Sequence, residues 1–241
     1  MESGMVRRAR FSAQSRLRAL QADIMDLILE RGLEAGDPLP TENELTAALG
    51  VGRNTLRESL KVLQAMGVLE IRHGFGMFVA SGNFDAFAEG LVFRSRLSLR
   101  RDGEDALQLL GIREALERGL LPAALAAATP ARLERLDEAV RHIEDLAGTG
   151  EHSAAADAEF HRCLFEPLGN DLLLQLLAVF WKVHRRIQLE AGPGMEDASA
   201  VAALYRGIHD AALAGDAETA GRLLSSRFEA LRARIAELPD R

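Results

Sequence analysis

Three side chains that can hydrogen-bond to the edges of DNA bases lie within two helical turns of one another, at Arg53, Asn54 and Arg57. Arginine pairs with O6 and N7 of guanine, and asparagine pairs with N6 and N7 of adenine. Arg53 and Arg57 are four residues apart and would share one face of a helix, which Lys61 continues. The pattern predicts a helix that reads DNA, although cations that only solvate a surface helix have the same spacing.

A second group of polar side chains is a candidate ligand site inside a helical domain. Asp157 and His161 are four residues apart, and His209 and Arg113 lie on other predicted helices. An aspartate and a histidine at this spacing also occur as an exposed surface pair, so both interpretations stay open. The sequence contains no phosphate-binding loop, zinc-protease, nucleophile-elbow or paired-cysteine motif.

The elements around the arginines predict how they are positioned. Apolar residues at helical spacing predict a helix over 12–31, and Thr41 with Glu44 is a capping box that opens a short helix ending at Gly50. A third helix follows Gly52 and ends near Met66, and two strands are expected at 68–72 and 77–80. This order is that of a winged helix-turn-helix, in which the third helix enters the major groove. The turn between the strands would present His73 beside Gly74, where the backbone can approach DNA closely.

The rest of the chain has a different character. Residues 81–83 are expected to form a linker between a domain at 1–80 and a second domain at 84–241. Alanine- and leucine-rich stretches then predict helices with no strand between them, at 84–97, 104–128, 130–147, 153–166, 171–190, 197–214 and 216–237. The expected fold is mainly α: a winged helix-turn-helix followed by an all-helical antiparallel bundle.

Composition limits the classes of function. The 241 residues are 48% hydrophobic and carry a net charge of −7, and no apolar run is long enough to span a bilayer. Residues 1–80 hold 10 basic and 10 acidic side chains, so the whole acidic excess lies in the second domain. A basic face on the first domain is therefore compatible with the acidic total. The single cysteine, Cys163, cannot form an internal disulfide, and a cytoplasmic protein is expected.

Residues 38–80, PLPTENELTAALGVGRNTLRESLKVLQAMGVLEIRHGFGMFVA, resemble the DNA-binding module of the GntR family of bacterial transcription regulators. The helical remainder resembles the effector domain of the FadR-like (FCD) subgroup. The resemblance implies a homodimer that binds a palindromic operator in double-stranded DNA and responds to a small metabolite. The DNA-contacting positions of the family correspond to Arg53, Asn54, Arg57, His73 and Gly74. Asn43 and Gly52 depart from the family pattern, which has arginine and serine or threonine there.

The resemblance also implies a divalent metal, zinc or nickel, held by an Asp-x-x-x-His pair and two later histidines. Asp157, His161 and His209 are matched to three of these positions, and Arg227 occupies the fourth. Either the three remaining ligands hold a metal, or the Arg227 guanidinium replaces it and binds an anion directly. Both alternatives predict a cationic pocket for an organic acid, lined by Arg113, Asp157, His161, His209 and Arg227.

An alternative from another class is a metal-dependent small-molecule enzyme built on the helical bundle, with the first domain as a docking module. It would need an acid, base or nucleophile that the sequence does not supply, because Cys163 and His161 are two residues apart and point in different directions on a helix. A DNA-binding regulator without certain cofactors is therefore the leading hypothesis.

Overall fold

The computed structural model describes residues 2–149, 153–192 and 197–237. Residues 1, 150–152, 193–196 and 238–241, which fall inside the two expected domains, lie outside the described residues. The chain divides into two compact units, residues 1–86 (unit 1) and 87–241 (unit 2).

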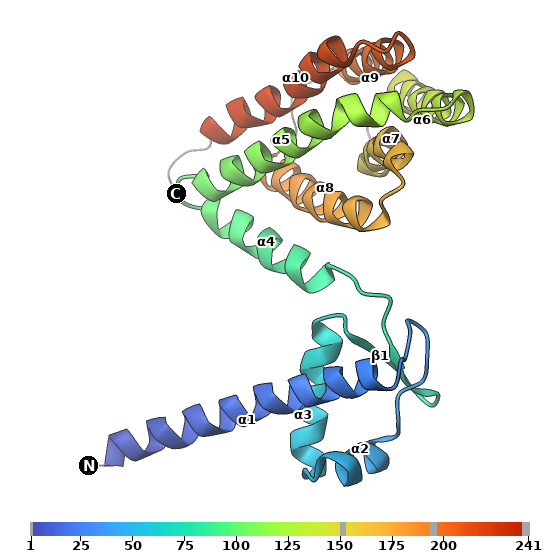
Figure 1. The fold of residues 1–241 in the computed structure, drawn as a ribbon. Helices are drawn as coiled ribbons and strands as arrows, with labels where there is room; N and C mark the ends of the chain where they lie inside the picture. The colour runs from blue at the N-terminus through green and yellow to red at the C-terminus, as the bar shows by residue number, and fades with distance from the viewer. Residues whose placement is uncertain (1, 150–152, 193–196, 238–241) are drawn as a thin grey trace. The chain divides into compact units, whose positions relative to one another are not determined.

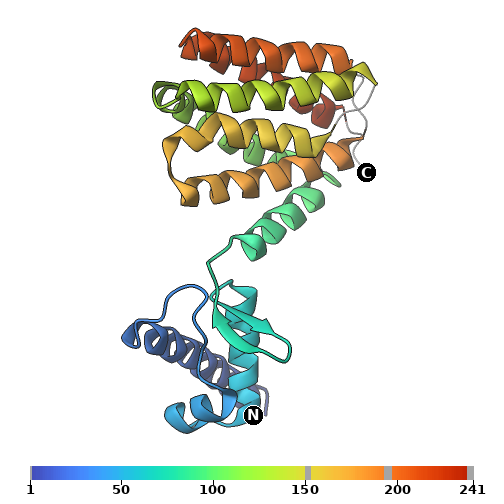
Figure 2. The same ribbon diagram turned by 90° about the vertical axis from the view of Figure 1, so that its right-hand side faces the viewer.

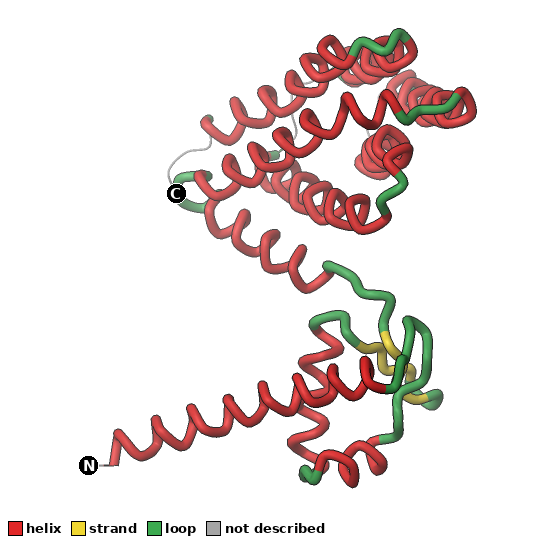
Figure 3. The backbone as a smooth tube through the Cα atoms, viewed as in Figure 1, coloured by secondary structure: helices red, strands yellow, loops and turns green. Residues whose placement is uncertain are grey.

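Unit 1 contains three helices followed by a two-stranded antiparallel sheet, coloured yellow in Figure 3. Its elements are α1 (Glu2–Glu30), α2 (Glu42–Leu49), α3 (Arg53–Ala65), β1 (Leu69–Arg72) and β2 (Gly76–Val79). In the sheet Leu69 lies opposite Val79, and Arg72 lies opposite Gly76. The order confirms the expected winged helix-turn-helix, with β1, β2 and their turn as the wing.

Local sequence explains where α2 and α3 begin and end. The capping box is formed: the Thr41 hydroxyl accepts from the Glu44 amide (3.3 Å), and the Glu44 carboxylate accepts from the Thr41 amide (2.8 Å). Gly50 ends α2 with a left-handed φ of 64°. Gly67, after α3, also has a positive φ, and an added Cβ would lie 3.0 Å from the Asn83 side chain.

The apolar stripe of α3 fixes which of its faces remains exposed. Leu56, Leu60 and Leu63 are buried against the core of unit 1, together with Ile24 from α1 and Leu45 from α2. Because these three leucines occupy one side of the helix, the polar residues between them must face away from the core.

Unit 2 is all-helical over its described residues, as Figure 2 shows in an approximately side-on view of its helices. Its elements are α4 (Asp85–Ser98, whose first residues belong to unit 1), α5 (Glu104–Ala126), α6 (Pro130–Gly148), α7 (Ala154–Phe165), a 3-10 turn (Glu166–Leu168), α8 (Asp171–Ala191), α9 (Ala198–Leu213) and α10 (Ala217–Ala236). These bounds confirm the predicted mainly α fold, and the helix limits lie within two residues of those expected.

The core of unit 2 is formed by side chains from several helices that pack together. Helix α5 packs against α7, α8 and α10, while α9 packs against α6 and α10. The largest fully buried side chains here include Phe160, Phe165, Tyr205 and Phe228. Several polar side chains are buried in the same core, namely Arg113, Glu117, His161, His184 and His209. Buried polar groups normally have hydrogen-bond partners, and the partners of Arg113, Glu117 and His161 are described next. No helix among the described residues is long and apolar enough to cross a membrane.

Candidate DNA-reading surface and ligand cavity

Helix α3 presents its polar face to solvent. Arg53, Asn54, Arg57 and Lys61 are all exposed, whereas the leucines between them are buried. Arg53 is the first residue of the helix, so its side chain lies at the end that would enter a groove. Thr55 is exposed in the same turn and was not singled out from the sequence.

Two of the basic side chains on this surface form ion pairs with glutamates. The Arg57 Nε donates to Glu42 Oε2 on α2 at 2.8 Å, and the Lys61 Nζ lies 3.0 Å from Glu58 Oε1. Both pairs are exposed, so each contributes little to stability. The Glu42 contact nevertheless joins α2 to α3 and orients the Arg57 guanidinium.

The wing tip is polar and glycine-rich, with one exposed aromatic ring. His73 and Gly74 are exposed, and Gly74 has a φ of 81°, which favours glycine. Phe75 is 83% exposed at the tip of the wing. Phe75 lies within the turn between the two predicted strands, and an aromatic residue at a hairpin tip is the signal in the sequence that marks it.

Unit 2 contains a cavity of about 250 Å³ bounded by five helices. Its lining is largely apolar in area but includes these polar side chains: Arg113 from α5, Asp157 and His161 from α7, Lys182, His184, Arg185 and Gln188 from α8, Tyr205 from α9 and Arg227 from α10. Trp181, Leu224, Phe228 and four alanines supply the apolar part. Lys182 and Arg185 are exposed, whereas Arg113 and Arg227 are largely buried. The volume suits a small metabolite better than a large ligand.

A buried ion-pair network fixes Arg113. Its Nε donates to Glu117 Oε1 at 2.7 Å, and the same oxygen accepts from Trp181 Nε1 at 2.9 Å. The Arg113 Nη2 lies 3.1 Å from His161 Nε2. Because a guanidinium can only donate, this His161 nitrogen accepts and the ring proton is on Nδ1, which lies 3.3 Å from Glu117 Oε2.

The charge states of this network follow from its partners. Burial alone would raise the pKa of the Glu117 carboxyl, but Arg113 and His161 together outweigh burial and hold that pKa well below its usual range. Burial lowers the pKa of His161, and the opposing effect of Glu117 does not cancel it. Glu117 is therefore ionised and His161 neutral; Arg113 engages His161 Nε2, whereas Nδ1 lies close to Glu117 Oε2 without the geometry of a hydrogen bond.

A second ion pair crosses the cavity from α10 to α7. The Arg227 Nη2 donates to Asp157 Oδ2 at 3.0 Å, and the side chains are only 12% and 14% exposed. The Arg227 guanidinium also lies over the Tyr205 ring, 4.4 Å from its centre. Burial raises the pKa of the Tyr205 phenol well above its ordinary value, and the adjacent Asp157 adds to this effect, so the phenol stays protonated.

His184 is a cavity residue that sequence reasoning missed. Its side chain is 9% exposed, its ring packs edge-on against Phe228, and within the described chain its buried Nδ1 has no hydrogen-bond partner. Burial, aided by the Arg113 and Arg227 guanidiniums, lowers the pKa of His184 well below its ordinary value. His184 is thus a neutral imidazole that lines the cavity and has one buried nitrogen without a partner among the described residues. The signal in the sequence was a lone histidine within the apolar stripe of α8.

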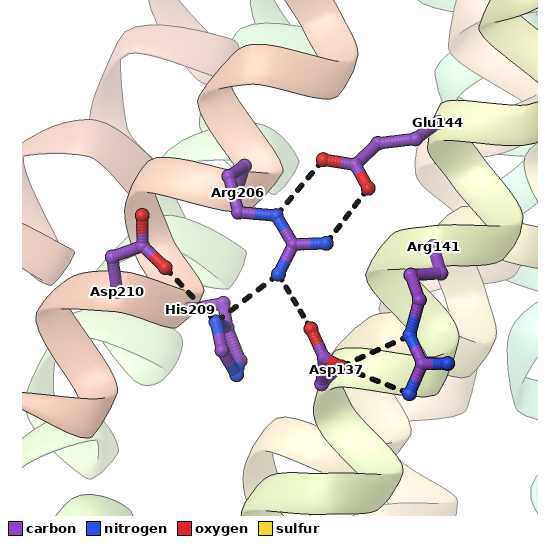
Figure 4. A network of polar contacts seen from close by, with 6 residues as sticks. All are labelled: Asp137, Arg141, Glu144, Arg206, His209 and Asp210. Atoms are coloured by element: carbon purple, nitrogen blue, oxygen red, sulfur yellow. Dashed lines mark hydrogen bonds and ion pairs between the residues drawn. The ribbon is translucent and has the colours of Figure 1, made fainter.

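His209 is not among the residues that line the cavity, so its assignment to the ligand set stays a prediction that the cavity lining does not support. His209 is buried in α9, where its Nδ1 lies 3.1 Å from Asp210 Oδ1 and 3.5 Å from Arg206 Nη1 (Figure 4). Arg206 in turn bridges to Glu144 and Asp137 of α6. Tyr205, one helical turn earlier, lines the cavity in its place, because four residues move a side chain about 6 Å along the helix axis.

The donor set does not fit the expected zinc or nickel ion. Of the three proposed ligands, His209 is elsewhere, Asp157 is bonded to Arg227, and His161 Nε2 accepts from Arg113. A divalent cation placed between Asp157 and His161 would lie beside two guanidinium groups and be repelled. Among the described residues, no group of three or more histidine, cysteine, aspartate or glutamate side chains is arranged to hold a metal.

Comparison with known proteins extends over both units. Residues 17–79 match the family of bacterial regulatory proteins of the gntR type, and residues 108–230 match the FCD domain. The putative L-lactate dehydrogenase operon regulatory protein of Escherichia coli (strain K12) is 31% identical over 233 residues, covering 88% of each chain. The chain belongs to the GntR family of bacterial regulatory proteins.

Two other relatives are consistent with this membership. The HTH-type transcriptional regulator LutR of Bacillus subtilis (strain 168) is 32% identical over 145 residues, which cover 60% of this chain and 64% of LutR, so the match spans slightly less than two thirds of that relative. A solved Streptococcus agalactiae GntR structure covers 90% of this chain and 99% of its own, with 26% identity and a TM-score of 0.64.

This GntR-family protein is a DNA-binding transcription regulator, and the enzyme alternative raised by the sequence is wrong. The lone cysteine fits that conclusion. Burial raises the pKa of the Cys163 thiol to about 11, so the thiol is protonated and unreactive near neutral pH.

Proposed function

We propose that this regulator reads an operator in double-stranded DNA with α3 and the wing, and that an organic acid bound in the unit 2 cavity controls that binding. DNA recognition is assigned to residues 1–80, the linker to 81–83, and ligand binding and dimerisation to 84–241. The observation that carries the proposal is a solvent-facing row of base-reading side chains beside a wing, in a GntR-family chain.

The proposed DNA contacts divide into two kinds. Arg53, Asn54 and Arg57 have the donors needed to read base edges, and Lys61, farther along the helix, suits the phosphate backbone. His73 and the Gly74 backbone would contact DNA from the wing. Gly52 caps α3 without a side-chain hydrogen bond, which leaves the first amides of the helix open to a phosphate.

One copy of α3 can read only a few base pairs, so we propose a homodimer on a palindromic site. The half-sites would lie about 34 Å apart, or a multiple of that distance, on the same face of the duplex. Sedimentation of the protein with and without DNA measures its stoichiometry, and footprinting measures the symmetry. Because the operator lies on chromosomal DNA, the proposed compartment is the cytoplasm.

The DNA assignment is tested with an operator selected from genomic fragments. We expect Arg57→Ala to weaken binding at least tenfold, because each base contact contributes ~1–3 kcal/mol and the change leaves the Glu42 carboxylate uncompensated near DNA. Arg31→Ala, an exposed arginine at the end of α1, is the matched control and should change the affinity less than twofold. Equal losses in both variants, or none in Arg57→Ala, would refute the assignment.

The proposed effector is a small carboxylic acid. The cavity offers the buried guanidiniums of Arg113 and Arg227 together with the neutral His184, and such a set favours an anion with one further polar group. The E. coli relative is named for an L-lactate dehydrogenase operon, so a 2-hydroxy acid is a reasonable first probe. Thermal-shift screening with L-lactate, glycolate, succinate and citrate, followed by release of operator DNA, tests this class.

A further inference from the structure

We propose that the cavity binds its acid without a metal, and that the Asp157 carboxylate is an internal stand-in which the incoming acid displaces from Arg227. The inference rests on the proposed function and specifies how the same cavity would work. It starts from the disagreement between the family's metal centre and the side chains of this chain.

The positive charge that a metal would supply comes instead from Arg227. The Arg227 side chain is 12% exposed, and its guanidinium stacks on the Tyr205 ring, 4.4 Å from the ring centre. This contact orients the guanidinium in the cavity. Its Nη2 donates to Asp157 Oδ2 at 3.0 Å. A planar guanidinium binds any carboxylate in much the same geometry, so an acid in the cavity competes with Asp157 for the same donors.

Arg113 cannot be the group that exchanges partners in this way. Its side chain is 6% exposed and its Nε is bonded to Glu117, whose side chain is fully buried and also accepts from Trp181. Removing Glu117 from this arrangement would leave an unpaired buried charge, which is strongly unfavourable. Arg113 is therefore a fixed donor at the wall of the cavity, and Arg227 is the arginine whose carboxylate can be replaced.

A separate observation also indicates a ligand. The His184 Nδ1 is buried, lacks a hydrogen-bond partner within the described residues, and belongs to a side chain that lines the same cavity. Buried polar atoms without partners are uncommon in folded proteins. An acid carrying a hydroxyl or a second oxygen near its carboxylate would give Nδ1 a partner while its carboxylate bonds to Arg227.

Displacement would change how two helices are connected. Asp157 and Arg227 are 70 residues apart and join α7 to α10, so loss of their ion pair removes a tie between these helices. The protonated Tyr205 phenol lies beside Asp157 and remains as a donor for the released carboxylate. The acid thus replaces the Asp157–Arg227 ion pair with an acid–Arg227 ion pair. It therefore binds more tightly to the state of unit 2 in which Asp157 has left Arg227 than to the state in which they are paired.

The decisive experiment compares Asp157→Asn with Arg227→Gln by calorimetric titration of the EDTA-treated full chain with L-lactate, succinate and inorganic phosphate. Without a metal, Asp157→Asn removes a competing negative charge, so at least one of these probes should bind about tenfold more tightly than to the wild type. Arg227→Gln should lose that binding. Arg222→Gln, an exposed arginine on the same helix, is the matched control and should bind like the wild type.

A metal-dependent site gives a different result: the EDTA-treated wild type would bind none of the probes, and with zinc or nickel restored Asp157→Asn would bind more weakly than the wild type. Metal content is measured in parallel on wild type incubated with zinc or nickel and then desalted. We expect well below one ion per chain. Stoichiometric metal, weaker binding in Asp157→Asn, or no probe binding to either wild type or Asp157→Asn would overturn the inference.

DNA binding is measured on the same preparations, which separates the two proposals. If the acid titrations give any of those contrary results but the protein still binds its operator, only the proposal of metal-free acid exchange is refuted. If the wild type shows no sequence-specific DNA binding, the proposed function is refuted instead. Melting curves of each variant identify any that do not fold, and Arg227→Lys, which keeps the charge but not the planar fork, should then retain part of the binding.

Discussion

Replacing Glu117 by glutamine measures how strongly the buried ion pair behind the cavity holds unit 2 together. The carboxylate is completely buried and makes three polar contacts: with Arg113 Nε at 2.7 Å, with Trp181 Nε1 at 2.9 Å and with His161 Nδ1 at 3.3 Å. Glutamine has nearly the same shape but no charge, and only one of its two terminal atoms accepts hydrogen bonds.

The magnitude follows from these contacts. If the amide oxygen keeps Arg113 and Trp181, its NH₂ group faces the Nδ1–H of His161, and two donors meet. If the amide is reversed, it faces two other donors instead. Either way a buried guanidinium loses its counter-charge. Breaking one partner of a buried pair costs ~3–5 kcal/mol, and because glutamine keeps some of the hydrogen bonds, a loss of about 3 kcal/mol in the free energy of unfolding is expected.

Urea denaturation followed by tryptophan fluorescence is the appropriate assay. Trp181 is the sole tryptophan of the chain and donates directly to Glu117, so its emission reports on unit 2 alone even though the protein has two units. Glu114→Gln is the matched control: Glu114 lies on the same helix and pairs with Arg232, but that arginine is 34% exposed. A loss of about 1 kcal/mol or less is expected there.

Two results would refute this reasoning. A change below about 1 kcal/mol in Glu117→Gln would mean that the buried carboxylate is neutral or its partners readily hydrated. Equal losses in the two variants would mean that burial of the pair makes no difference. A lower denaturant midpoint with an unchanged slope is the expected form of the result, since the unfolded state is unaffected.

Two further predictions concern the same unit and use the same fluorescence assay. Gly103→Ala should destabilise unit 2 by about 2 kcal/mol, because Gly103 has a φ of 71° and an added Cβ would lie 2.6 Å from Ile235 Cγ2. Gly215→Ala, with a φ of 69° and open space around it, should cost only about 1 kcal/mol, so similar losses would exclude the clash. For pH, burial and the two guanidiniums lower the pKa of His184, so below the unfolded pKa of about 6.5 the unfolded chain binds a proton that the folded chain does not. The free energy of unfolding should therefore fall as pH drops from 7 to 5. His184→Gln should reduce the slope of this free energy against pH by up to ~1.4 kcal/mol per pH unit. An unchanged slope would show that His184 is not buried and neutral.

The residues of unit 1 could be assigned from sequence because their geometry is encoded locally. Thr41 and Glu44 cap α2 through contacts three residues apart, and Gly67 supplies a positive φ after α3. The apolar spacing of Leu56, Leu60 and Leu63 fixes the buried side of α3 and therefore the exposed side, where Arg53 and Arg57 lie. Each of these relations spans only a few residues, so periodicity and capping rules suffice.

Helix limits in unit 2 were predictable for the same reason, and so was the substitution of a cation at position 227. The composition of the cavity was not. Its charged and polar groups come from five helices spread over more than a hundred residues, and which face of each helix turns inward depends on how all of them pack together. Helical spacing places Tyr205 and His209 on the same side of α9, yet only Tyr205 reaches the cavity, while His209 bonds to Arg206 and Asp210.

The roles of His184 and Glu117 illustrate the same division. In sequence, Glu117 lies four residues after Arg113 and His184 lies on the apolar face of its helix, but neither position reveals its neighbours on other helices. Folding brings Glu117 to Arg113, His161 and Trp181, and leaves the His184 Nδ1 unpaired beside two guanidiniums. Local sequence thus specified the helices, the wing and the exposed arginines through short-range hydrogen bonds and side-chain periodicity. The burial of these charged groups and their contacts between helices required long-range packing, because ionised groups in a low-dielectric core must have partners.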